Sequence, residues 1–588
     1  MKADELKKKY IDFFVKKGHK KLPNLSLMPE NDPTTLFISA GMQPLMPYLL
    51  GEPHPLGKRL VSLQRCLRTG DIEEVGNVFH NTFFEMLGNW SLGDYWKRES
   101  LSWSYEFLTK ILGLNPKRFH VTIFKGDKNA PKDEESEKIW LSLGIPKERI
   151  YPLPKKDNWW ETGGTGPGGP DSEIFYDIGK PACGPSCRPG DNCGRFFEMW
   201  NNVFMEYNRK PDGSYEKLKQ KNVDTGMGVE RTTAVLEGKE NIYQTELFAG
   251  LVNQIEKISG QKYDEKTKKP MRIITDHLRA AVFLLGDGVL PSNVDQGYIL
   301  RRLIRRAVRY GRLLQVRKPF VSQVAKVVIN GYQEDYLFLE EKKKEIFQEL
   351  AAEEKRFSKT LERGLKEFEK LGRRLKSRMI TGQQAFYLYE TYGFPLEMTE
   401  ELGLEEGFKV DKKEFEQAQK KHQEKSRVSL EKKFAGGLAD HSKEVTKLHT
   451  ATHLLHQALR DVLGEHVRQV GSNITAERLR FDFTHSEKLT EEQIKKVEKI
   501  VNQKIKENLP VKMEVMTLAE AKQKDVLAFF SERYGEKVKI YLIGDYSKEV
   551  CGGPHVDFTE EIGSVKIIKE KPVGAGRRRI YAELAHGS

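Results

Sequence analysis

Residues 65–96 read RCLRTGDIEEVGNVFHNTFFEMLGNWSLGDYW and predict two β-strands joined by a charged loop. Arg68 closes the first predicted strand, and Phe83 and Phe84 open the second. An arginine can bind a phosphate through two parallel hydrogen bonds, and an aromatic ring offers an apolar face to a purine. The stretch therefore predicts a nucleotide site carried by a β-sheet.

A second segment, VDTGMGVERTTAVLEG at residues 223–238, can complete such a site. Gly226 and Gly228 let the backbone approach a ligand closely, and Arg231 follows on a predicted helix. The same spacing is also typical of an ordinary glycine turn before a helix, and both interpretations stay open. The chain contains no G-x-x-x-x-G-K-[ST] motif, which excludes a P-loop ATP site.

The composition indicates a folded protein that acts on a polyanion or has an evenly basic surface. Of the 588 residues, 38% are hydrophobic and 31% charged, and the net charge is +13. No apolar run reaches the roughly 18 residues of a membrane span, and residues 1–22 resemble an amphipathic helix more than a signal peptide. The five cysteines are an odd number, which favours free or metal-binding thiols over disulfides. We expect a cytoplasmic protein without a membrane segment.

Three segments of different character follow one another along the chain. Residues 1–250 mix strand-like runs with helices and Gly/Pro-rich loops, which indicates an α+β domain. Residues 251–434 consist mainly of long helical patterns. Residues 435–588 return to an α+β mixture after AGGLADHS at 435–442, which is typical of a linker. The predicted fold class is α+β and multidomain.

The segment GYILRRLIRRAVRYGRLLQVRK at residues 297–318 predicts a helix with one apolar and one basic face. No acidic residue lies between Gln296 and Gln333, so the guanidinium groups have no local partners and contact with phosphates is favoured. A solvated basic face is the alternative. The arginines concerned are Arg301, Arg302, Arg305, Arg306 and Arg309.

Two pairs of potential metal ligands lie in the C-terminal segment. His449 and His453 are four residues apart in a helical pattern, and Cys551 and His555 have the same spacing in CGGPH. Helix positions four residues apart share a face, and three imidazoles with one thiolate suit tetrahedral Zn²⁺. Histidines of the core are the alternative for the first pair taken alone. His456 lies near the same helix face and is predicted to be a packing residue or a neighbour of the ligands.

A second group of thiols occurs in ACGPSCRPGDNC, which contains Cys183, Cys187 and Cys193. With Asp191 or Asp171 as a fourth ligand, these thiols can form a second zinc site. A glycine-rich loop with reduced thiols and no metal is the alternative.

Strings along the whole chain resemble the alanyl-tRNA synthetases, a family of class II aminoacyl-tRNA synthetases. Residues 65–96 and 223–238 are similar to motifs 2 and 3 of that class, and FISAGMQP, MWNNVFMEYNR, DGVLPSN, LYETYGFP, LHTATHLLH, LRFDF and CGGPHV follow the family's order. The resemblance implies an antiparallel-sheet aminoacylation domain at 1–250, a helical domain at 251–434 that recognises the tRNA acceptor stem, and a zinc-containing editing domain at 435–588. It implies activation of alanine with ATP and Mg²⁺, and transfer of alanine to the 3′ end of tRNA(Ala). It also implies hydrolysis of mischarged Ser-tRNA(Ala) and Gly-tRNA(Ala).

Carried over residue by residue, the resemblance implies a set of substrate contacts. Arg68 would bind the α-phosphate of ATP and the alanine carboxylate, Arg231 the γ-phosphate, and Asp224 the α-ammonium group. His80 would reach the nucleotide, and a histidine at a strand end is the alternative. The remaining positions are Met42, Trp160 and Val203 as walls of the alanine pocket, and Phe84, Gly226 and Gly228 beside ATP.

The resemblance also implies contacts to tRNA. Asn293 matches a residue that reads a G·U pair in the acceptor stem, and Glu390 stands where the family has a shorter aspartate. The basic helix would contact the same tRNA. Gln469 and Arg480 match positions of the editing site, where Pro554 replaces the commoner threonine. Because four protein ligands fill a zinc ion, a zinc-bound hydroxide is less expected there than in a three-ligand site.

The chain also departs from the family. Gly164, Gly168 and Asp171 stand where many members carry Asp, Cys and Cys. The β-barrel and the C-terminal dimerisation segment of many relatives are missing, so a compact monomer is expected. Two other functions remain, a trans-editing hydrolase with a degenerate synthetase half and a metal-dependent hydrolase unrelated to tRNA. The first is disfavoured because the three charged substrate-binding residues are present, and the second because it leaves the basic helix without a role.

Overall fold

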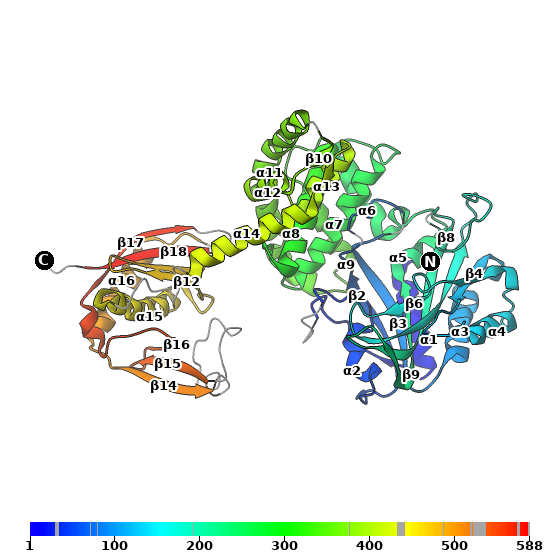
Figure 1. Cartoon of the computed structure of the whole chain (residues 1–588), viewed down its shortest axis with the longest axis horizontal. Coiled ribbons are helices and arrows are strands. Elements are labelled where there is room, and N and C mark those ends of the chain that lie inside the picture. The colour runs from blue at the N-terminus through cyan, green and yellow to red at the C-terminus, as the bar shows by residue number, and fades with distance from the viewer. Residues whose placement is uncertain are drawn as a thin grey trace. The chain divides into compact units, whose positions relative to one another are not determined.

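The chain forms two compact units, residues 1–411 and residues 412–588 (Figure 1). The predicted division near residues 250 and 434 stays a prediction. All but Ser442 of the expected linker at 435–442 lies outside the described residues. The structure is a computed structural model that describes residues 1–29, 35–70, 72–78, 80–191, 193–375, 377–431, 442–485, 487–517, 520, 537–572 and 577–585.

A nine-stranded sheet forms the centre of the first unit, in the order β1-β2-β3-β9-β8-β7-β4-β5 with β6 paired to β7. Among these strands only the pairs β1–β2 and β4–β5 are parallel, so the predicted antiparallel sheet is confirmed. The two strands expected within residues 65–96 are β2 and β3, which pair with Cys66 opposite Phe84. The strands are β1 (Lys20–Lys21), β2 (Arg59–Leu67), β3 (Phe83–Leu92), β4 (Phe119–Phe124), β5 (Ile150–Leu153), β6 (Trp159–Glu161), β7 (Gly166–Asp177), β8 (Phe196–Arg209) and β9 (Tyr215–Gly228).

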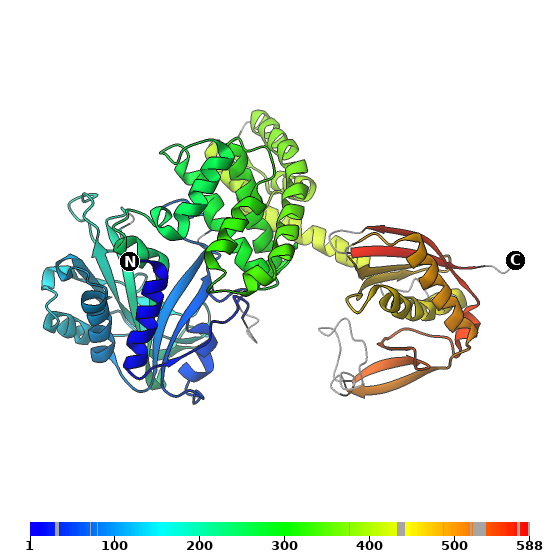
Figure 2. The ribbon, with the colours of Figure 1, turned by 180° about the vertical axis from the view of Figure 1, so that it is seen from behind.

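Helix α1 (Ala3–Lys16) lies across this sheet (Figure 2) and packs against β2, β3 and α5 (Val229–Leu236). Its apolar residues recur at three- and four-residue spacing, and Leu6 and Tyr10 are fully buried. The Tyr10 hydroxyl donates to Asn89 Oδ1 of β3 at 2.9 Å. The amphipathic helix expected at the N-terminus is therefore confirmed.

The remainder of the first unit is mainly helical. The predicted basic helix is α8 (Asp295–Leu313), which packs against α7 and α11 through an apolar face in which Leu300, Leu303 and Ile304 are fully buried. The other helices are α2 (Met46–Leu49), α3 (Lys97–Glu106), α4 (Glu134–Ser142), α6 (Glu246–Ser259), α7 (Lys268–Gly286), α9 (Val321–Tyr332), α10 (Phe338–Glu341), α11 (Lys343–Arg374), α12 (Gly382–Tyr392) and α13 (Leu396–Glu405), with a short sheet of β10 (Met379–Ile380) and β11 (Lys409–Val410).

In the second unit, α15 and α16 pack on a four-stranded antiparallel sheet of order β12-β13-β18-β17. Leu455 of α15 and Phe481 and Phe483 of β13 are fully buried in the core between these layers. A separate antiparallel sheet contains β14, β15 and β16. The elements are α14 (Lys412–Glu431), α15 (Lys443–Leu463), β12 (Gln469–Ile474), β13 (Leu479–Thr484), α16 (Glu491–Lys506), β14 (Val511–Thr517), β15 (Lys537–Ile543), β16 (Ser547–Val550), β17 (Val565–Pro572) and β18 (Arg577–Leu584).

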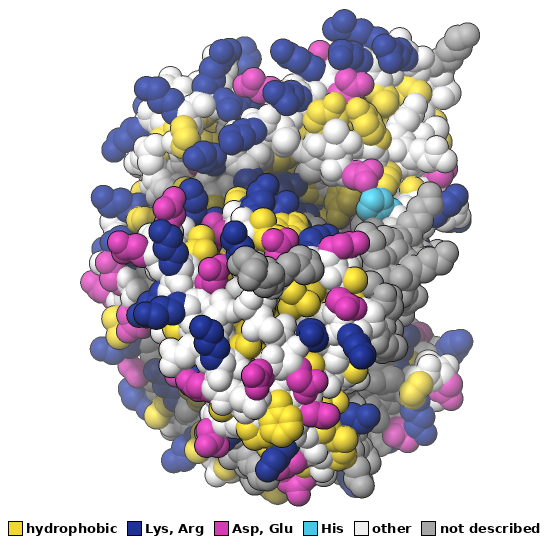
Figure 3. Space-filling model, turned by 90° about the vertical axis from the view of Figure 1, so that its left-hand side faces the viewer, with side chains coloured by type: hydrophobic (Ala, Val, Ile, Leu, Met, Phe, Trp, Pro, Cys, Tyr) yellow, Lys and Arg dark blue, Asp and Glu magenta, His cyan; other side chains and the backbone are white. Residues whose placement is uncertain are grey.

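The surface is rich in basic side chains. Lys and Arg side chains occur over the whole face drawn in Figure 3, and in its lower half they lie among Asp and Glu side chains. On this face the basic side chains are therefore spread out and do not form a single stripe. Among the described helices, none combines the length and the apolar character that crossing a membrane requires.

Candidate functional site

A cavity of about 890 Å³ opens on the sheet of the first unit. Residues of β3, β7, β8 and β9 form part of its wall, so segments far apart in the sequence meet here. Most of the predicted substrate-binding residues line it: Arg68, His80, Phe84, Trp160, Val203, Asp224, Gly226, Gly228 and Arg231. The two stretches that predicted a nucleotide site therefore contribute to one cavity.

Asp224 and Val203 form one corner of this cavity. They lie opposite each other on β9 and β8, so their side chains share one face of the sheet. The indole N–H of Trp90 donates to Asp224 Oδ1 at 2.7 Å and orients the carboxylate. Burial raises the pKa of Asp224 to about 7, and the hydrogen bond from Trp90 offsets that rise only in part. A cation that binds beside this carboxylate would favour its charged form.

Met42 lies beneath this corner and does not line the cavity. It is fully buried in a hydrophobic cluster with Trp90 and Val203, and Trp160 packs against the same cluster. Of the three residues predicted as pocket walls, Val203 and Trp160 therefore line the cavity, whereas Met42 packs in the cluster with them.

Arg68 and Arg231 both reach the cavity with free donor capacity. The Nε of Arg68 donates to the carbonyl of Ser39 at 3.2 Å, and its guanidinium lies 4.9 Å from the centre of the Phe84 ring. Arg231 Nη1 donates to Glu198 Oε2 at 2.5 Å. A guanidinium has five N–H donors, so each arginine retains donors for a phosphate.

His80, Gly226 and Gly228 line the cavity in different ways. The side-chain amide of Asn77 donates to His80 Nδ1 at 2.7 Å, so the neutral ring carries its proton on Nε2. A Cβ added to Gly228 would meet no atom within 4 Å, which leaves its backbone open to a ligand. An added Cβ at Gly226 would lie 3.2 Å from the sulfur of Met86. The absence of a side chain thus serves ligand approach at Gly228 and packing at Gly226.

The arginines of α8 have acidic partners on other elements. These partners are not local in the sequence, as expected, but carboxylates from other segments pair with the arginines, so the absence of local partners does not favour phosphate contact. Arg302, Arg306 and Arg309 are also buried, so they fix α8 to its neighbours and do not face a phosphate. The ion pairs are Arg302 with Glu73 and Glu397, Arg305 with Glu353, Arg306 with Glu401, and Arg309 with Glu401 and Glu405.

The other predicted tRNA contacts lie nearer the surface. Arg301 donates to Asn293 Oδ1, so these two residues are adjacent. Asn293 is exposed just before α8, and Glu390 is exposed on α12. The predicted tRNA contacts thus fall into two groups. Asn293, Arg301 and Glu390 are accessible, whereas the other arginines of α8 are held in ion pairs.

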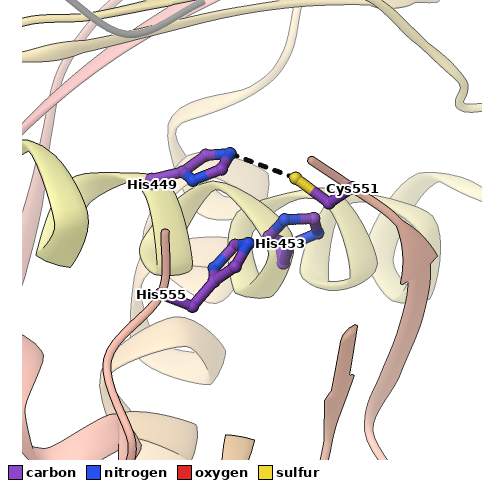
Figure 4. A group of neighbouring side chains, drawn as sticks. All are labelled: His449, His453, Cys551 and His555. Atoms are coloured by element: carbon purple, nitrogen blue, oxygen red, sulfur yellow. Dashed lines mark hydrogen bonds between the residues drawn. The ribbon is translucent and has the colours of Figure 1, made fainter. Parts of the chain in front are cut away.

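The four predicted metal ligands of the second unit converge (Figure 4). His449 and His453 lie one turn apart on α15, and Cys551 and His555 follow β16. One ligand atom from each lies within 4.8 Å of the others. His449 Nε2 and Cys551 Sγ are 3.3 Å apart. Bonds of about 2.0 Å to nitrogen and 2.3 Å to sulfur at a tetrahedral zinc would separate the two atoms by about 3.5 Å.

The three histidines are each held by an oxygen atom at Nδ1, which turns Nε2 toward the centre. Within the described residues, Nε2 of His453 and of His555 is buried and has no hydrogen-bond partner. Histidines that ligate a metal usually have their second nitrogen held in this way, so the donor set fits Zn²⁺. The contacts of Nδ1 are His449 with the carbonyl of Pro554 at 2.9 Å, His453 with Glu549 Oε2 at 2.7 Å, and His555 with Thr450 Oγ1 at 3.2 Å.

The thiol of this centre is ionised, and its negative charge favours the binding of a cation. Burial opposes ionisation of Cys551, but the surrounding histidines outweigh it and lower the pKa of the thiol to about 3. His456 donates from Nδ1 to Glu549 Oε1 at 2.8 Å. His456 therefore acts through Glu549 on His453 and is not among the ligands, as predicted.

Gln469 and Arg480 lie on β12 and β13, the strands against which α15 packs. Gln469 Nε2 donates to Ser472 Oγ at 3.2 Å, and Arg480 Nε lies 3.6 Å from Asp482 Oδ1. Within the described part of the chain, neither residue contacts the four ligands. The predicted editing residues therefore share the sheet beside the metal centre but do not belong to it.

Comparisons with known proteins match both units of the chain. A family model described as tRNA synthetases class II (A) matches residues 5–503, and a model of the threonyl and alanyl tRNA synthetase second additional domain matches residues 538–581. An alanine–tRNA ligase of Treponema denticola is 57% identical over 99% of both chains, and one of Borreliella afzelii is 54% identical over 99% of this chain and 100% of its own. The chain belongs to the alanine–tRNA ligase family.

This member of the alanine–tRNA ligase family has a cluster of three acidic side chains in its cavity, which the sequence motifs did not reveal. Asp171, Glu173 and Glu198 line the cavity beside Arg231. Asn201 Nδ2 donates to Asp171 Oδ2 at 3.1 Å and lies 3.4 Å from Glu173 Oε1. Burial raises the pKa of Asp171 to about 7, and burial together with the charges of Glu198 and Asp171 raises that of Glu173. Carboxylate oxygens are the ligands that Mg²⁺ prefers, so the residues fit that ion.

The sequence did contain a signal for this group. Glu173 and Asn201 are paired on β7 and β8, and acidic residues in two neighbouring strands predict clustering only once their register is known.

The three thiols of the loop between the same strands also lie together. One ligand atom each from Cys183, Cys187 and Cys193 falls within 4.8 Å of the others.

Proposed function

We propose that the chain is an alanine–tRNA ligase that activates alanine with ATP and transfers it to tRNA(Ala). The observation that carries the proposal is the cavity in which the buried Asp224 and a small apolar wall lie together with Arg68 and Arg231. Membership of the alanine–tRNA ligase family supports the same reading. Such an enzyme works in the cytoplasm, where its tRNA is.

Alanine is proposed to bind at the corner of Asp224 and Val203. The α-ammonium group pairs with the Asp224 carboxylate, which the indole N–H of Trp90 already orients at 2.7 Å. The methyl group packs against Val203 and Trp160, so larger side chains are excluded by volume. This arrangement directs the alanine carboxylate toward the arginines, and positioning of this kind supplies much of the rate of a bimolecular reaction.

ATP is proposed to occupy the rest of the cavity. The adenine lies against Phe84 and the open backbone at Gly228, Arg68 binds the α-phosphate and the alanine carboxylate, and Arg231 binds the γ-phosphate. His80 offers an N–H donor at Nε2. Mg²⁺ held by carboxylates of the cavity would neutralise phosphate charge.

In the first step an oxygen of the alanine carboxylate attacks the α-phosphorus, and pyrophosphate leaves with the bonding electron pair. In the second step a hydroxyl of the 3′-terminal ribose of tRNA attacks the carbonyl carbon of the adenylate, and AMP leaves. No side chain of the enzyme becomes covalently attached. Arg68 stabilises the charge on the α-phosphate under attack, and Arg231 stabilises the charge on the leaving pyrophosphate.

Recognition of tRNA is proposed to use the accessible residues near α8. Asn293 and the adjacent Arg301, together with Glu390 of α12, would contact an acceptor stem, and their exposure supports this role. Asn293 and Glu390 can read base edges, whereas Arg301 contacts a phosphate. The buried arginines of α8 hold the helix that presents this surface.

The second unit is proposed to remove serine and glycine from tRNA(Ala). A pocket sized for a methyl group rejects glycine or a serine hydroxyl by only about 10²-fold, so a separate hydrolytic site is needed. His449, His453, Cys551 and His555 would hold Zn²⁺, which supplies a fixed positive charge that orients the tRNA end. Because four side chains fill a tetrahedral ion, we propose that Gln469 and Arg480 position the ester and that water comes from outside this shell.

Alanine-dependent exchange of pyrophosphate into ATP tests the main proposal with purified, metal-replete protein. Asp224→Asn should abolish exchange, whereas Asp212→Asn in the exposed turn between β8 and β9 should preserve it. Absence of exchange in the unaltered protein, combined with hydrolysis of Ser-tRNA(Ala), would instead identify a trans-editing hydrolase.

A further inference from the structure

We propose that Cys183, Cys187 and Cys193 form a second zinc site, separate from the one in the other unit, which braces the loop between β7 and β8. The three thiols come from one loop, and their sulfur atoms lie within 4.8 Å of one another. Three sulfur atoms gathered at this distance are the donor set of a structural zinc site.

The spacing of the sulfur atoms fits a single ion. Cys187 Sγ and Cys193 Sγ are 3.7 Å apart. Two thiolates bound to one tetrahedral zinc at about 2.3 Å are separated by about 3.8 Å. A disulfide would require about 2.05 Å, and a [4Fe–4S] cluster would hold its cysteines further apart because each binds a different iron.

Asp191 is the candidate for the fourth ligand, and its carboxylate would have to move closer to join the group that the three sulfur atoms form. Its Oδ2 lies 4.0 Å from Cys183 Sγ and accepts a hydrogen bond from the backbone N–H of Arg188 at 2.9 Å. Asp171, the other candidate from the sequence, is turned into the substrate cavity, where Asn158 and Asn201 donate to it. Three thiolates and the Asp191 carboxylate therefore make the proposed shell.

The loop has little else to order it. Residues 178–195 contain no helix or strand in their described part, and among the described positions from 179 to 193 only Pro189 is buried. A segment without its own core depends on a cross-link or a metal for a fixed shape. The base of the loop is closed by Arg195, whose Nη2 lies 2.6 Å from Asp177 Oδ2.

A braced loop has a consequence for the neighbouring cavity. The loop joins the end of β7 to the start of β8, and Asp177 pairs with Phe196 at that junction. Glu198, which holds Arg231, lies two residues further along β8. The ion therefore fixes the register of the two strands that carry the carboxylates of the cavity.

Metal analysis of purified variants tests the proposal without reference to any activity. The unaltered chain should contain about two zinc ions per molecule. The variant Cys551→Ala should contain about one. The triple variant Cys183→Ser/Cys187→Ser/Cys193→Ser should also contain about one. The variant that combines all four changes should contain none. Cys66→Ala, which alters a buried thiol far from both groups in the sequence, should keep both ions.

A measurement on the unaltered protein guards against a triple variant that fails to fold. Alkylation followed by peptide mass mapping should modify Cys183, Cys187 and Cys193 slowly before chelation and rapidly after it. Hydrogen exchange of residues 178–195 should accelerate on chelation in parallel.

Two outcomes would overturn the proposal. One is a single zinc ion that is lost entirely in Cys551→Ala, with the three loop thiols equally reactive before and after chelation. The other is a disulfide between Cys187 and Cys193 in protein purified with its metal.

Discussion

Asp224 is the single residue on which recognition of alanine depends most in the proposed mechanism. Its carboxylate is buried, its pKa is raised to about 7 by that burial, and the Trp90 indole orients one of its oxygens. An ammonium group binds the ionised form and not the neutral one. The residue therefore couples substrate binding to pH.

We predict that alanine binding weakens below neutral pH. Because the pKa of Asp224 in the free protein is about 7, the carboxyl group takes up a proton as the pH falls through that value. Each pH unit further down should raise the KM for alanine in pyrophosphate exchange about tenfold. The measurement is a series of exchange assays from pH 5.5 to 8.5 at saturating ATP and Mg²⁺.

The matched control is Asp224→Asn, in which any residual exchange should lose this dependence. A KM for alanine that stays constant across the range while exchange remains active would contradict the role of Asp224.

At the scale of elements, α8 shows how a charged helix can be structural. Its apolar face packs on α7 and α11, and its guanidiniums form ion pairs with carboxylates of α11 and α13. Breaking a buried pair by removing one partner leaves an uncompensated charge, which costs about 3–5 kcal/mol. Most of the basic face of α8 is therefore part of the interior.

We predict that substitution of two arginines of this helix affects stability to different extents. Arg306→Ala should lower the free energy of unfolding by about 2 kcal/mol, because it removes a buried guanidinium that pairs with Glu401 and donates to the Ile72 carbonyl, while Glu401 keeps its ion pair with Arg309. Arg301→Ala should change stability by no more than about 0.5 kcal/mol, because that residue is partly exposed and has no carboxylate contact in the described structure. Urea unfolding followed by circular dichroism measures both.

Charging of tRNA separates the two roles further. Arg301→Ala should raise the KM for tRNA and lower the salt dependence of binding by about one unit of the logarithmic slope, while pyrophosphate exchange is preserved. If Arg306→Ala were as stable as the unaltered protein but defective in tRNA binding, the structural role of α8 would be refuted.

The elements and several ligands could be predicted from the sequence because their signals are local. Hydrophobic periodicity identified α1 and α8, and the four-residue spacing placed His449 and His453 on one face of α15. Contacts across the fold carry no such signal. The carboxylates that pair with α8 and the burial of Met42 beneath the cavity depend on which segments meet, and the sequence pattern does not contain that information.

At the scale of the whole molecule, the chain carries two candidate sites in two separate compact units. The cavity of the first unit uses residues up to Arg231, and the metal centre of the second uses residues from His449 onward. Each site has its own supporting core and hydrogen-bond partners. Two reactions assigned to such sites should respond independently to substitution.

We therefore predict a double dissociation in the full-length chain. Cys551→Ala removes a ligand and should slow hydrolysis of Ser-tRNA(Ala) on the order of 100-fold or more, since even the loss of an outer partner of a ligand costs 10–100-fold. Pyrophosphate exchange should stay within about twofold, because additivity holds for sites that share no contacts. Asp224→Asn should show the reverse pattern, and Ser-tRNA(Ala) for its assay is prepared with the unaltered enzyme. Parallel loss of both reactions in either variant, with a normal unfolding profile, would show that the two sites are not independent and that the second unit takes part in the synthetic reaction.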